Sequence, residues 1–320
     1  MVAPPAEEPE LRPGDRWRQA VQGWLLPKAV VDQAPEPVAL EPERFRWRSE
    51  EDAKQPVRPS RRRALEALPE GGSVLDVGVG GGASSLGLAP RAALITGVDP
   101  LEAMLESFEA SAPAAGVTPR SVCGSWPEVA DQVEPADVVV CHHAIYGQPE
   151  IEPFLAALTA KARHRVVIEI GARPPLIGIN PLFKSFHGIE RLDWPVADQA
   201  EAVLTSMGLE VEREDIVLPA QAPDVSPERV AFTRRRLCVG ADRDEEIAQF
   251  LRQLPPTEMR SGPVVARHRL AAELPGIITA CPLESTAGRA PAGGTNTWPA
   301  EDDGRQSSSG GPWRLGRAPP

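Results

Sequence analysis

Short apolar runs alternate with amphipathic stretches through the middle of this 320-residue chain. The runs are rich in β-branched residues, and the stretches between them repeat apolar residues every three or four positions, as strands alternating with helices do. This alternation predicts an α/β fold: a doubly wound, mostly parallel sheet with helices on both faces. The predicted strands are 74–78, 94–98, 120–123, 137–141, 165–170, 209–218 and 229–239. The predicted helices are 61–68, capped by Ser60, and 82–89, 101–112, 151–162, 198–207 and 242–254.

The last two predicted strands, 209–218 and 229–239, are joined by a Pro-rich turn without a helix between them. Neighbouring strands joined in this way usually form an antiparallel hairpin. The predicted sheet is therefore parallel except for its last strand.

Composition divides the chain into three parts. Residues 1–57 are rich in proline and charge and indicate a partly disordered arm with one short helix, from Asp15 to about Pro27. Residues 58–254 form the α/β domain, including its C-terminal helix. Residues 255–320 indicate a mostly disordered tail, because Gly, Ser, Pro and Ala dominate from about position 283 onward. The aromatic residues of the arm are expected to anchor it, with substrate contact as the alternative: Trp17, Trp24, Phe45 and Trp47.

The formal net charge is −11, and the two dense basic runs, Arg61–Arg63 and Arg234–Arg236, are short. A nucleic-acid partner normally faces a basic patch, so none is expected. The four cysteines lack the spacing of a zinc or redox motif, and no metal is expected. Without a signal pattern or a long apolar run, the chain is predicted to be cytoplasmic and to cross no membrane. The oligomeric state is left open.

A glycine-rich loop follows the first strand of the α/β domain. Asp76 lies near the end of that strand, and four of the next residues, from Gly78 to Gly82, are glycines. Glycine adopts positive φ readily and lets a ligand approach the backbone. At the carboxyl edge of a doubly wound sheet, such a loop is a ligand-binding position.

Two cofactors compete for this loop. Gly78, Gly80 and Ala83 formally fit the dinucleotide pattern G-x-G-x-x-A, and Asp99 supplies the acid that this pattern expects further along. Asp76 and the loop glycines also fit the pattern D-x-G-x-G-x-G. Asp76 decides between the two, because a carboxylate there opposes a pyrophosphate and attracts an ammonium group. S-adenosylmethionine is therefore favoured over NAD.

The stretch Ser73–Leu105 resembles the class I methyltransferase superfamily, and residues 59–240 are similar to it in the order and spacing of elements. Overall the chain resembles uncharacterised members from high-GC bacteria. The resemblance implies a seven-stranded sheet with a reversed last strand, S-adenosylmethionine as the cofactor, and a ribose contact for Asp99. It departs at Ser125, where many members carry an acid beside the adenine; Trp126 is expected to cover the adenine, with core packing as the alternative. The expected cofactor-binding residues are Asp76, Gly78, Gly80, Gly82, Asp99, Pro100, Met104, Ser125, Trp126 and Cys141.

The methyl acceptor is expected beyond the fourth strand, at His142, His143 and Tyr146. Histidine titrates near neutrality and can take a proton as the methyl group is transferred, although a backbone hydrogen bond is the alternative role for either histidine. Methyl transfer can also proceed by orientation alone, without a base. The loop Arg173–Gly188 is long for a connection and is expected to be a substrate lid, with core packing as the alternative. It contains Asn180-Pro181-Leu182-Phe183, which resembles the motif of base-modifying enzymes but follows the fifth strand, so that role is not assigned.

The sequence thus predicts an enzyme that transfers a methyl group from S-adenosylmethionine to a small molecule. The alternatives are a methyltransferase-like protein that binds the cofactor for regulation or assembly without turnover, a protein or RNA methyltransferase, and an NAD-dependent oxidoreductase.

Overall fold

A computed structural model describes residues 11–36, 42, 45–46, 51, 54, 57–173, 176–191, 196–255 and 257–267. The strands are β1 (Gly72–Val77), β2 (Ala92–Asp99), β3 (Thr118–Cys123), β4 (Ala136–His142), β5 (Ala162–Gly171), β6 (Glu210–Arg213), β7 (Ile216–Gln221) and β8 (Thr257–Arg267). The α-helices are α1 (Pro13–Trp24), α2 (Lys28–Asp32), α4 (Pro59–Ala67), α5 (Glu102–Ala115), α6 (Ile151–Ala160), α7 (Asn180–His187), α8 (Ala197–Ser206), α9 (Pro227–Leu237) and α10 (Asp244–Gln253). Short 3₁₀ turns are η2 (Leu86–Leu88), η3 (Ala130–Gln132), η4 (Ile177–Ile179) and η5 (Ala241–Arg243).

The strands form one sheet in the order β3-β2-β1-β4-β5-β8-β6. The first five run parallel, and β8 lies antiparallel between β5 and β6. β7 follows β6 directly along the chain and pairs with the first half of β8, so β6 and β7 share one position at the edge. The predicted seven-stranded, doubly wound sheet with a reversed last strand is confirmed.

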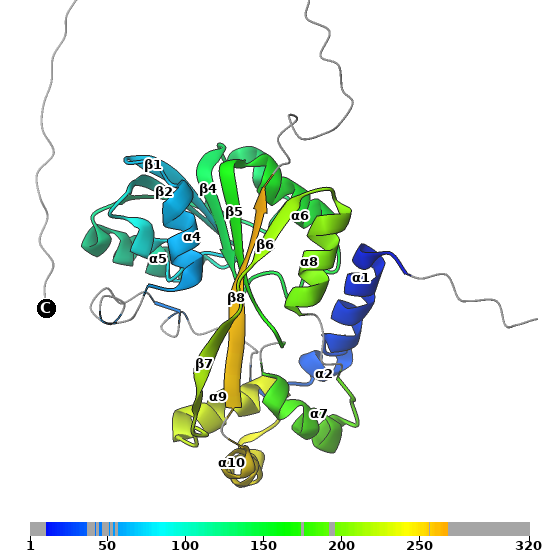
Figure 1. Ribbon diagram of the computed structural model, residues 1–320. Coiled ribbons are helices and arrows are strands. Elements are labelled where there is room, and N and C mark those ends of the chain that lie inside the picture. Colours follow the sequence, from blue (N-terminus) through cyan, green and yellow to red (C-terminus); the bar gives the residue numbers. More distant parts are fainter. Residues whose placement is uncertain are drawn as a thin grey trace, which may run out of the picture. The chain divides into compact units, whose positions relative to one another are not determined.

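Each face of the sheet is covered by helices (Figure 1). On one face, Val74, Val138 and Val167 pack against apolar residues of α4 and α5. On the other face, the alternate residues of the same strands pack against α6, α8 and α1. Successive strand residues point to opposite faces, so continuous apolar strands are required to fill both layers.

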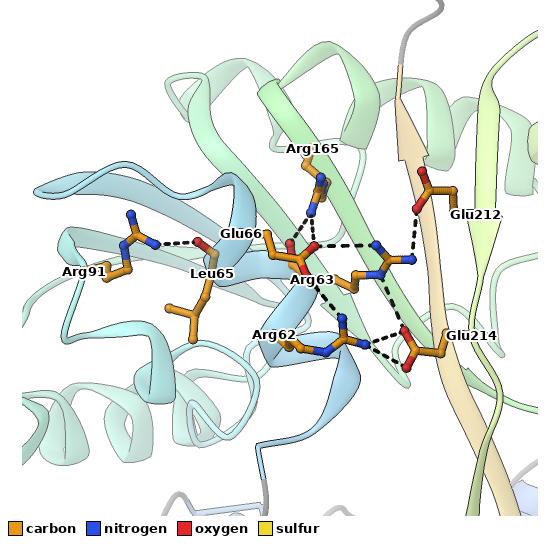
Figure 2. A network of polar contacts seen from close by, with 8 residues as sticks. All are labelled: Arg62, Arg63, Leu65, Glu66, Arg91, Arg165, Glu212 and Glu214. Atoms are coloured by element: carbon orange, nitrogen blue, oxygen red, sulfur yellow. Dashed lines mark hydrogen bonds and ion pairs between the residues drawn. The ribbon is translucent and has the colours of Figure 1, made fainter.

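Helix α4 is fastened to the sheet by a network of charged side chains (Figure 2). Glu66 on α4 pairs with Arg165 of β5 at 3.1 Å, and Arg63 pairs with Glu212 of β6 at 2.9 Å. Arg62 pairs with Glu214 at 2.7 Å. The exposed pairs among these contribute little singly, on the order of 0–1 kcal/mol each, whereas Arg165 is buried. As a network they fix the helix, whose first turn reaches the carboxyl edge of the sheet.

A second helical cluster lies beyond the carboxyl end of β5. That strand ends at Gly171, opposite Ser261, whereas β8 continues past it, paired with β7. Helices α7, α9 and α10, which we call the three-helix group, pack on one another through a separate apolar cluster. The loop expected to be a lid thus contains η4 and α7 and belongs to this group.

The predicted strand 229–239 is wrong, because this segment is helix α9. Ser226 caps the helix by accepting a hydrogen bond from the backbone N–H of Arg229 at 3.2 Å, and Pro227 begins it. The buried residues are Val230, Thr233 and Leu237, spaced three and four apart rather than alternating. The reversed strand is β8 instead, which lies inside the segment 255–320 predicted to be a tail. Val264, Val265 and Ala266 of β8 are buried, and residues 268–320 lie outside the described part.

Two predicted helices are also corrected. The segment 82–89 contains only the 3₁₀ turn η2, since Gly82, Gly87 and Pro90 leave no uninterrupted run for a longer helix. Ser60 does not cap α4, which begins at Pro59 after Arg58. Its hydroxyl group lies in the first turn and donates a hydrogen bond to Glu169 instead.

Candidate functional site

Asp76 is the penultimate residue of β1 and is fully buried. Its Oδ2 accepts a hydrogen bond from the Ser84 hydroxyl at 2.7 Å, which the return of the glycine loop brings close. Its Oδ1 and the Ser85 Oγ are buried with no hydrogen-bond partner among the described residues. Burial raises the pKa of Asp76 to about 6. The Ser84 hydrogen bond opposes this shift, and so does the hydroxyl group of Ser85, which lies close to Asp76 without the geometry of a hydrogen bond.

The glycine loop depends on three residues with positive φ: Gly78 at 77°, Gly80 at 52° and Gly82 at 89°. Gly78 lies where β1 and the end of β4 meet, because a Cβ atom there would clash with the Cβ atom of Ala144. The Gly78 N–H donates to the Val98 carbonyl at 2.8 Å, which turns the loop toward β2. Glycine is thus required both by conformation and by space.

Asp99 ends β2 and is tied to the same loop. Its carboxylate accepts hydrogen bonds from the backbone N–H of Gly80 at 3.1 Å and of Leu101 at 3.0 Å. Burial raises the pKa of Asp99, and those two hydrogen bonds oppose the shift. The predicted acids Asp76 and Asp99 are therefore brought to opposite sides of one loop.

Part of the N-terminal arm lies on this loop. Arg46 forms isolated β-bridges with Gly81 and Gly82, and the backbone of Phe45 lies against Gly81. Farther back, Trp17 is fully buried, and its indole N–H donates to the Gln148 carbonyl at 2.6 Å. Trp17 therefore anchors α1 to the loop after β4, and Trp47 lies outside the described residues.

A second group of polar side chains gathers where β4 and β5 end, around Glu169, which is 1% exposed. The Ser60 hydroxyl donates to Glu169 Oε2 at 2.5 Å, and Arg58 pairs with Oε1 at 3.3 Å. His143 Nε2 also lies 3.3 Å from Oε1. Burial raises the pKa of Glu169, but the hydrogen bond from His143, the neighbouring His142 and the Ser60 hydroxyl outweigh it and lower the pKa.

His143 and Tyr146 form a chain that starts from Glu169. The Tyr146 oxygen accepts a hydrogen bond from the Gly171 N–H at 2.7 Å and lies 3.3 Å from His143 Nδ1. The phenol O–H is therefore placed to donate to Nδ1, which fixes the proton of His143 on Nε2, facing Glu169. Burial raises the pKa of Tyr146 to about 12, so it stays protonated. His143 has a φ of 56°, a strained conformation that is common at functional sites.

His142 is neutral at pH 7. Burial lowers its pKa to about 4, although Glu169, with Oε2 3.9 Å from Nδ1, opposes the shift. The Nε2 atom of His142 is buried, and no hydrogen-bond partner for it occurs in the described part of the chain. All three side chains expected at the acceptor site thus meet around one carboxylate.

The other predicted cofactor-binding residues are divided between core and surface. Met104, Trp126 and Cys141 are buried, and the Trp126 indole N–H donates to the Phe154 carbonyl at 3.2 Å, which favours core packing for this side chain. Pro100 and Ser125 are exposed. No group of three side chains suited to binding a metal occurs among the residues described.

Sequence reasoning missed Glu169, Ser60 and Arg58. One signal was available: Glu169 interrupts the apolar run of β5, and a carboxylate in a strand buried on both faces needs partners. The partners themselves could not be read, because Ser60 lies 109 positions away.

Residues 74–164 match the model of a family described as a methyltransferase domain. The matched segment contains the glycine loop, Asp99 and the residues from His142 to Tyr146. The match confirms the predicted resemblance to methyltransferases over these residues and supports S-adenosylmethionine as the cofactor.

Solved structures to which this chain is similar include three proteins. The YcgJ protein from Bacillus subtilis is 16% identical, with 66% of this chain and 98% of that one covered and a TM-score of 0.47. A SAM-dependent methyltransferase from Thiobacillus denitrificans, in complex with S-adenosyl-L-homocysteine, is 18% identical, with coverages of 76% and 99% and a TM-score of 0.45. A putative sarcosine dimethylglycine methyltransferase from Galdieria sulphuraria is 14% identical, with coverages of 80% and 98% and a TM-score of 0.46. A search of curated proteins gave no match. No described helix is both long and apolar enough to span a membrane.

Proposed function

We propose that this chain, whose residues 74–164 match a methyltransferase domain, transfers a methyl group from S-adenosylmethionine to a small molecule. The observation that carries the proposal is the buried carboxylate of Asp76, which has an oxygen without a partner in the described residues, beside a loop built from positive-φ glycines. An unsatisfied buried carboxylate costs free energy that a cationic ligand recovers. S-adenosylmethionine, when bound, supplies an electrophilic methyl group and carries an ammonium group of the required charge.

The loop residues fit this cofactor better than they fit NAD. Asp76 offers negative charge where a dinucleotide would present a pyrophosphate, and Asp99 offers carboxylate oxygens at the end of β2 that suit ribose hydroxyl groups. Asp76, the loop glycines and Asp99 would therefore hold the cofactor. The exposed Ser125 and the core position of Trp126 leave the adenine contacts to other groups.

The acceptor is proposed to lie at the ends of β4 and β5, against His143. The ring of His143 is oriented by Glu169 through Nε2, which leaves Nδ1 as the only ring atom that can accept a proton. Because Tyr146 lies 3.3 Å from Nδ1, His143 can act as a base only when the acceptor displaces the Tyr146 hydroxyl. Without that exchange, the residues around Glu169 contribute by orienting the acceptor. The net charge of −11 supports a small molecule over RNA as the acceptor.

Titration calorimetry with S-adenosylhomocysteine, followed by a search for its release from S-adenosylmethionine across a panel of small acceptors, tests the proposal. The informative variant is Gly78→Ala, whose new Cβ atom would collide with Ala144. We expect at least about a 30-fold loss of affinity, or roughly 2 kcal/mol. Gly116→Ala is the matched control, because Gly116 has nearly the same φ, 76°, but nothing within 4 Å of its Cβ position.

Each outcome has a distinct meaning. Wild-type affinity in Gly78→Ala would reject the glycine loop as the cofactor site. Tight binding without release of product from any acceptor would favour the alternative of a cofactor-binding protein without turnover. Binding of NAD in place of S-adenosylhomocysteine would reject the proposal altogether.

A further inference from the structure

Arg191 is a charged side chain without a counter-ion among the described residues. It follows α7, and its guanidinium lies 4.3 Å from the ring centre of Trp24 and 4.5 Å from that of Phe183. Its Nε donates to the Trp24 carbonyl at 2.9 Å. No carboxylate in the described ranges lies within 4 Å of it, and its neighbour Glu190 pairs with Lys184 instead.

Arg243 differs from Arg191 because it has a counter-ion. Arg243 also lies over an aromatic ring, at 5.3 Å from Phe186, but it pairs with Glu246 at 3.0 Å. Burial lowers the pKa of Arg191 to about 10, and no acidic group among the described residues opposes the shift. Taking an arginine partly out of water without an anion is costly, so a missing partner is the simplest explanation.

On the two helices that Arg191 contacts, α1 and α7, further polar groups also lack partners among the described residues. The Trp24 indole Nε1 is buried without an acceptor in the described part of the structure, although its ring lies under the guanidinium. On α7, the side-chain amide of Asn180 is buried with neither of its polar atoms paired to a described residue. Asn180 precedes Phe183 by three positions and so shares its helix face. The Trp24 indole N–H on α1 and the Asn180 amide on α7 thus lack described hydrogen-bond partners, and Arg191 contacts both helices.

Helix α1 and the segment that contains α7 are both connected to the candidate site. Helix α1, which ends at Trp24, is fixed by Trp17 to Gln148, two residues after Tyr146. The segment with η4 and α7 begins at the end of β5, where Gly171 contacts Tyr146. Arg191 therefore lies on the carboxyl side of the sheet, three residues after Gly188, the last residue of the predicted substrate lid.

We propose that Arg191, held against the rings of Trp24 and Phe183, binds an anionic oxygen group of the methyl acceptor, such as a carboxylate, phosphate or sulfate. A guanidinium presents a planar pair of N–H donors that matches two oxygens of such a group. Stacking fixes its orientation before binding, so less side-chain entropy is lost. The identification of the ligand as the acceptor rests on the proposed function; the anion site itself does not.

Thermal unfolding of the full chain in sodium benzoate, phosphate or sulfate, against sodium chloride at equal ionic strength, tests this inference. The variants are Arg191→Gln and the matched control Arg243→Gln. We expect at least one of the three anions to raise the melting temperature of the wild type and of Arg243→Gln by about 2–4 °C more than that of Arg191→Gln. Comparing variants removes the general stabilisation that phosphate and sulfate give to any protein. The anion with the largest difference identifies the chemistry.

An equal rise in wild type and Arg191→Gln for all three anions, or no rise at all, would overturn the inference. If Arg191→Gln does not fold, Arg191→Lys replaces it; it keeps the charge but loses the planar fork, and the rise should fall by at least half. Titration with S-adenosylhomocysteine separates the two proposals, since Arg191→Gln should bind it like the wild type. An anion effect in a protein that does not bind S-adenosylhomocysteine would reject the proposed function and retain the site.

Discussion

Asp76 on β1 and Glu169 on β5 are buried carboxylates near the carboxyl ends of their strands, and they differ in how many hydrogen-bond and ion-pair partners surround them. Asp76 on β1 receives one hydrogen bond and has an oxygen with no described partner, and its pKa is raised to about 6. Glu169 on β5 is bonded to Ser60, Arg58 and His143, and its pKa is lowered. The first is incomplete as it stands, whereas the second is satisfied by the protein itself.

The difference assigns different roles to the two groups. A carboxylate left short of donors marks a place where a cationic ligand can bind. A carboxylate surrounded by donors fixes the groups that surround it, here the ring of His143. We therefore treat Asp76 as a binding residue and Glu169 as a positioning residue.

The largest expected effect comes from Glu169→Gln. The amide cannot carry the charge that Arg58 and His143 face, so the free energy of unfolding at pH 7 should fall by about 2–3 kcal/mol. A lowered pKa stabilises the folded state above the unfolded value of 4.5, and this contribution is lost as the pH falls below it. Urea unfolding should therefore show the gap between wild type and variant closing below about pH 4.5.

Glu66→Gln is the matched control for this variant. Glu66 also joins α4 to β5, through Arg165, but it is 39% exposed. Its loss should cost no more than about 1 kcal/mol. If the two variants behaved alike, Glu169 would be an ordinary surface-type pair rather than the centre of the β4–β5 cluster.

Asp76→Asn should have a smaller effect on folding and a specific effect on the cofactor. We expect the affinity for S-adenosylhomocysteine to fall about 10- to 100-fold, which is about 1.4–2.8 kcal/mol. The unliganded variant should be as stable as the wild type or more so at pH 7, because a neutral amide avoids the cost of burying a charge. Calorimetry and urea unfolding on the same samples would show this separation, and a loss of stability without a loss of affinity would contradict it.

Asp76 changes the free energy of unfolding with pH in the opposite direction to Glu169, because its pKa is raised rather than lowered. A raised pKa means that the wild type loses stability as the pH rises from about 4 to about 6, and the variant does not. His142, whose pKa is lowered to about 4, acts in the opposite direction between its usual 6.5 and 4. The two effects largely cancel in the wild type. Only the difference between wild type and variant, which should grow in favour of the variant up to pH 6, isolates Asp76.

The two regions also differ in how far the sequence could predict them. Asp76 and the loop glycines are consecutive, and Asp99 follows at the end of the next strand, so local chemistry was enough to group them. The cluster around Glu169 joins α4, β4 and β5, and residues more than 100 positions apart meet only after the sheet forms. His142, His143 and Tyr146 were predicted as one segment, but their shared carboxylate was not.

The fold was predicted best where apolar runs are long and central. The parallel strands β1 to β5 were all expected. β1, β2, β4 and β5 are mostly buried and apolar, as strands covered on both faces are, whereas β3 is a partly exposed strand at the edge. The errors in the predicted strands fall in the C-terminal part of the chain. The run 229–239 contains many β-branched and apolar residues, and only the spacing of Val230, Thr233 and Leu237 reveals a helix. β8 was missed because the proline- and glycine-rich composition around it outweighed a short apolar run.

The smallest expected effect comes from adding a carboxylate at the carboxyl end of β3. Ser125 is exposed at the end of β3, where the resemblance to methyltransferases places an acid beside the adenine. Ser125→Asp should raise the affinity for S-adenosylhomocysteine about twofold to fivefold, or roughly 0.4–1 kcal/mol, because an exposed charge is well screened. Ser125→Asn, of the same shape without the charge, is the matched control. Equal affinities in the two variants would mean that the adenine amine does not face this position, and an increase confined to low salt would assign the gain to long-range charge rather than to a direct contact.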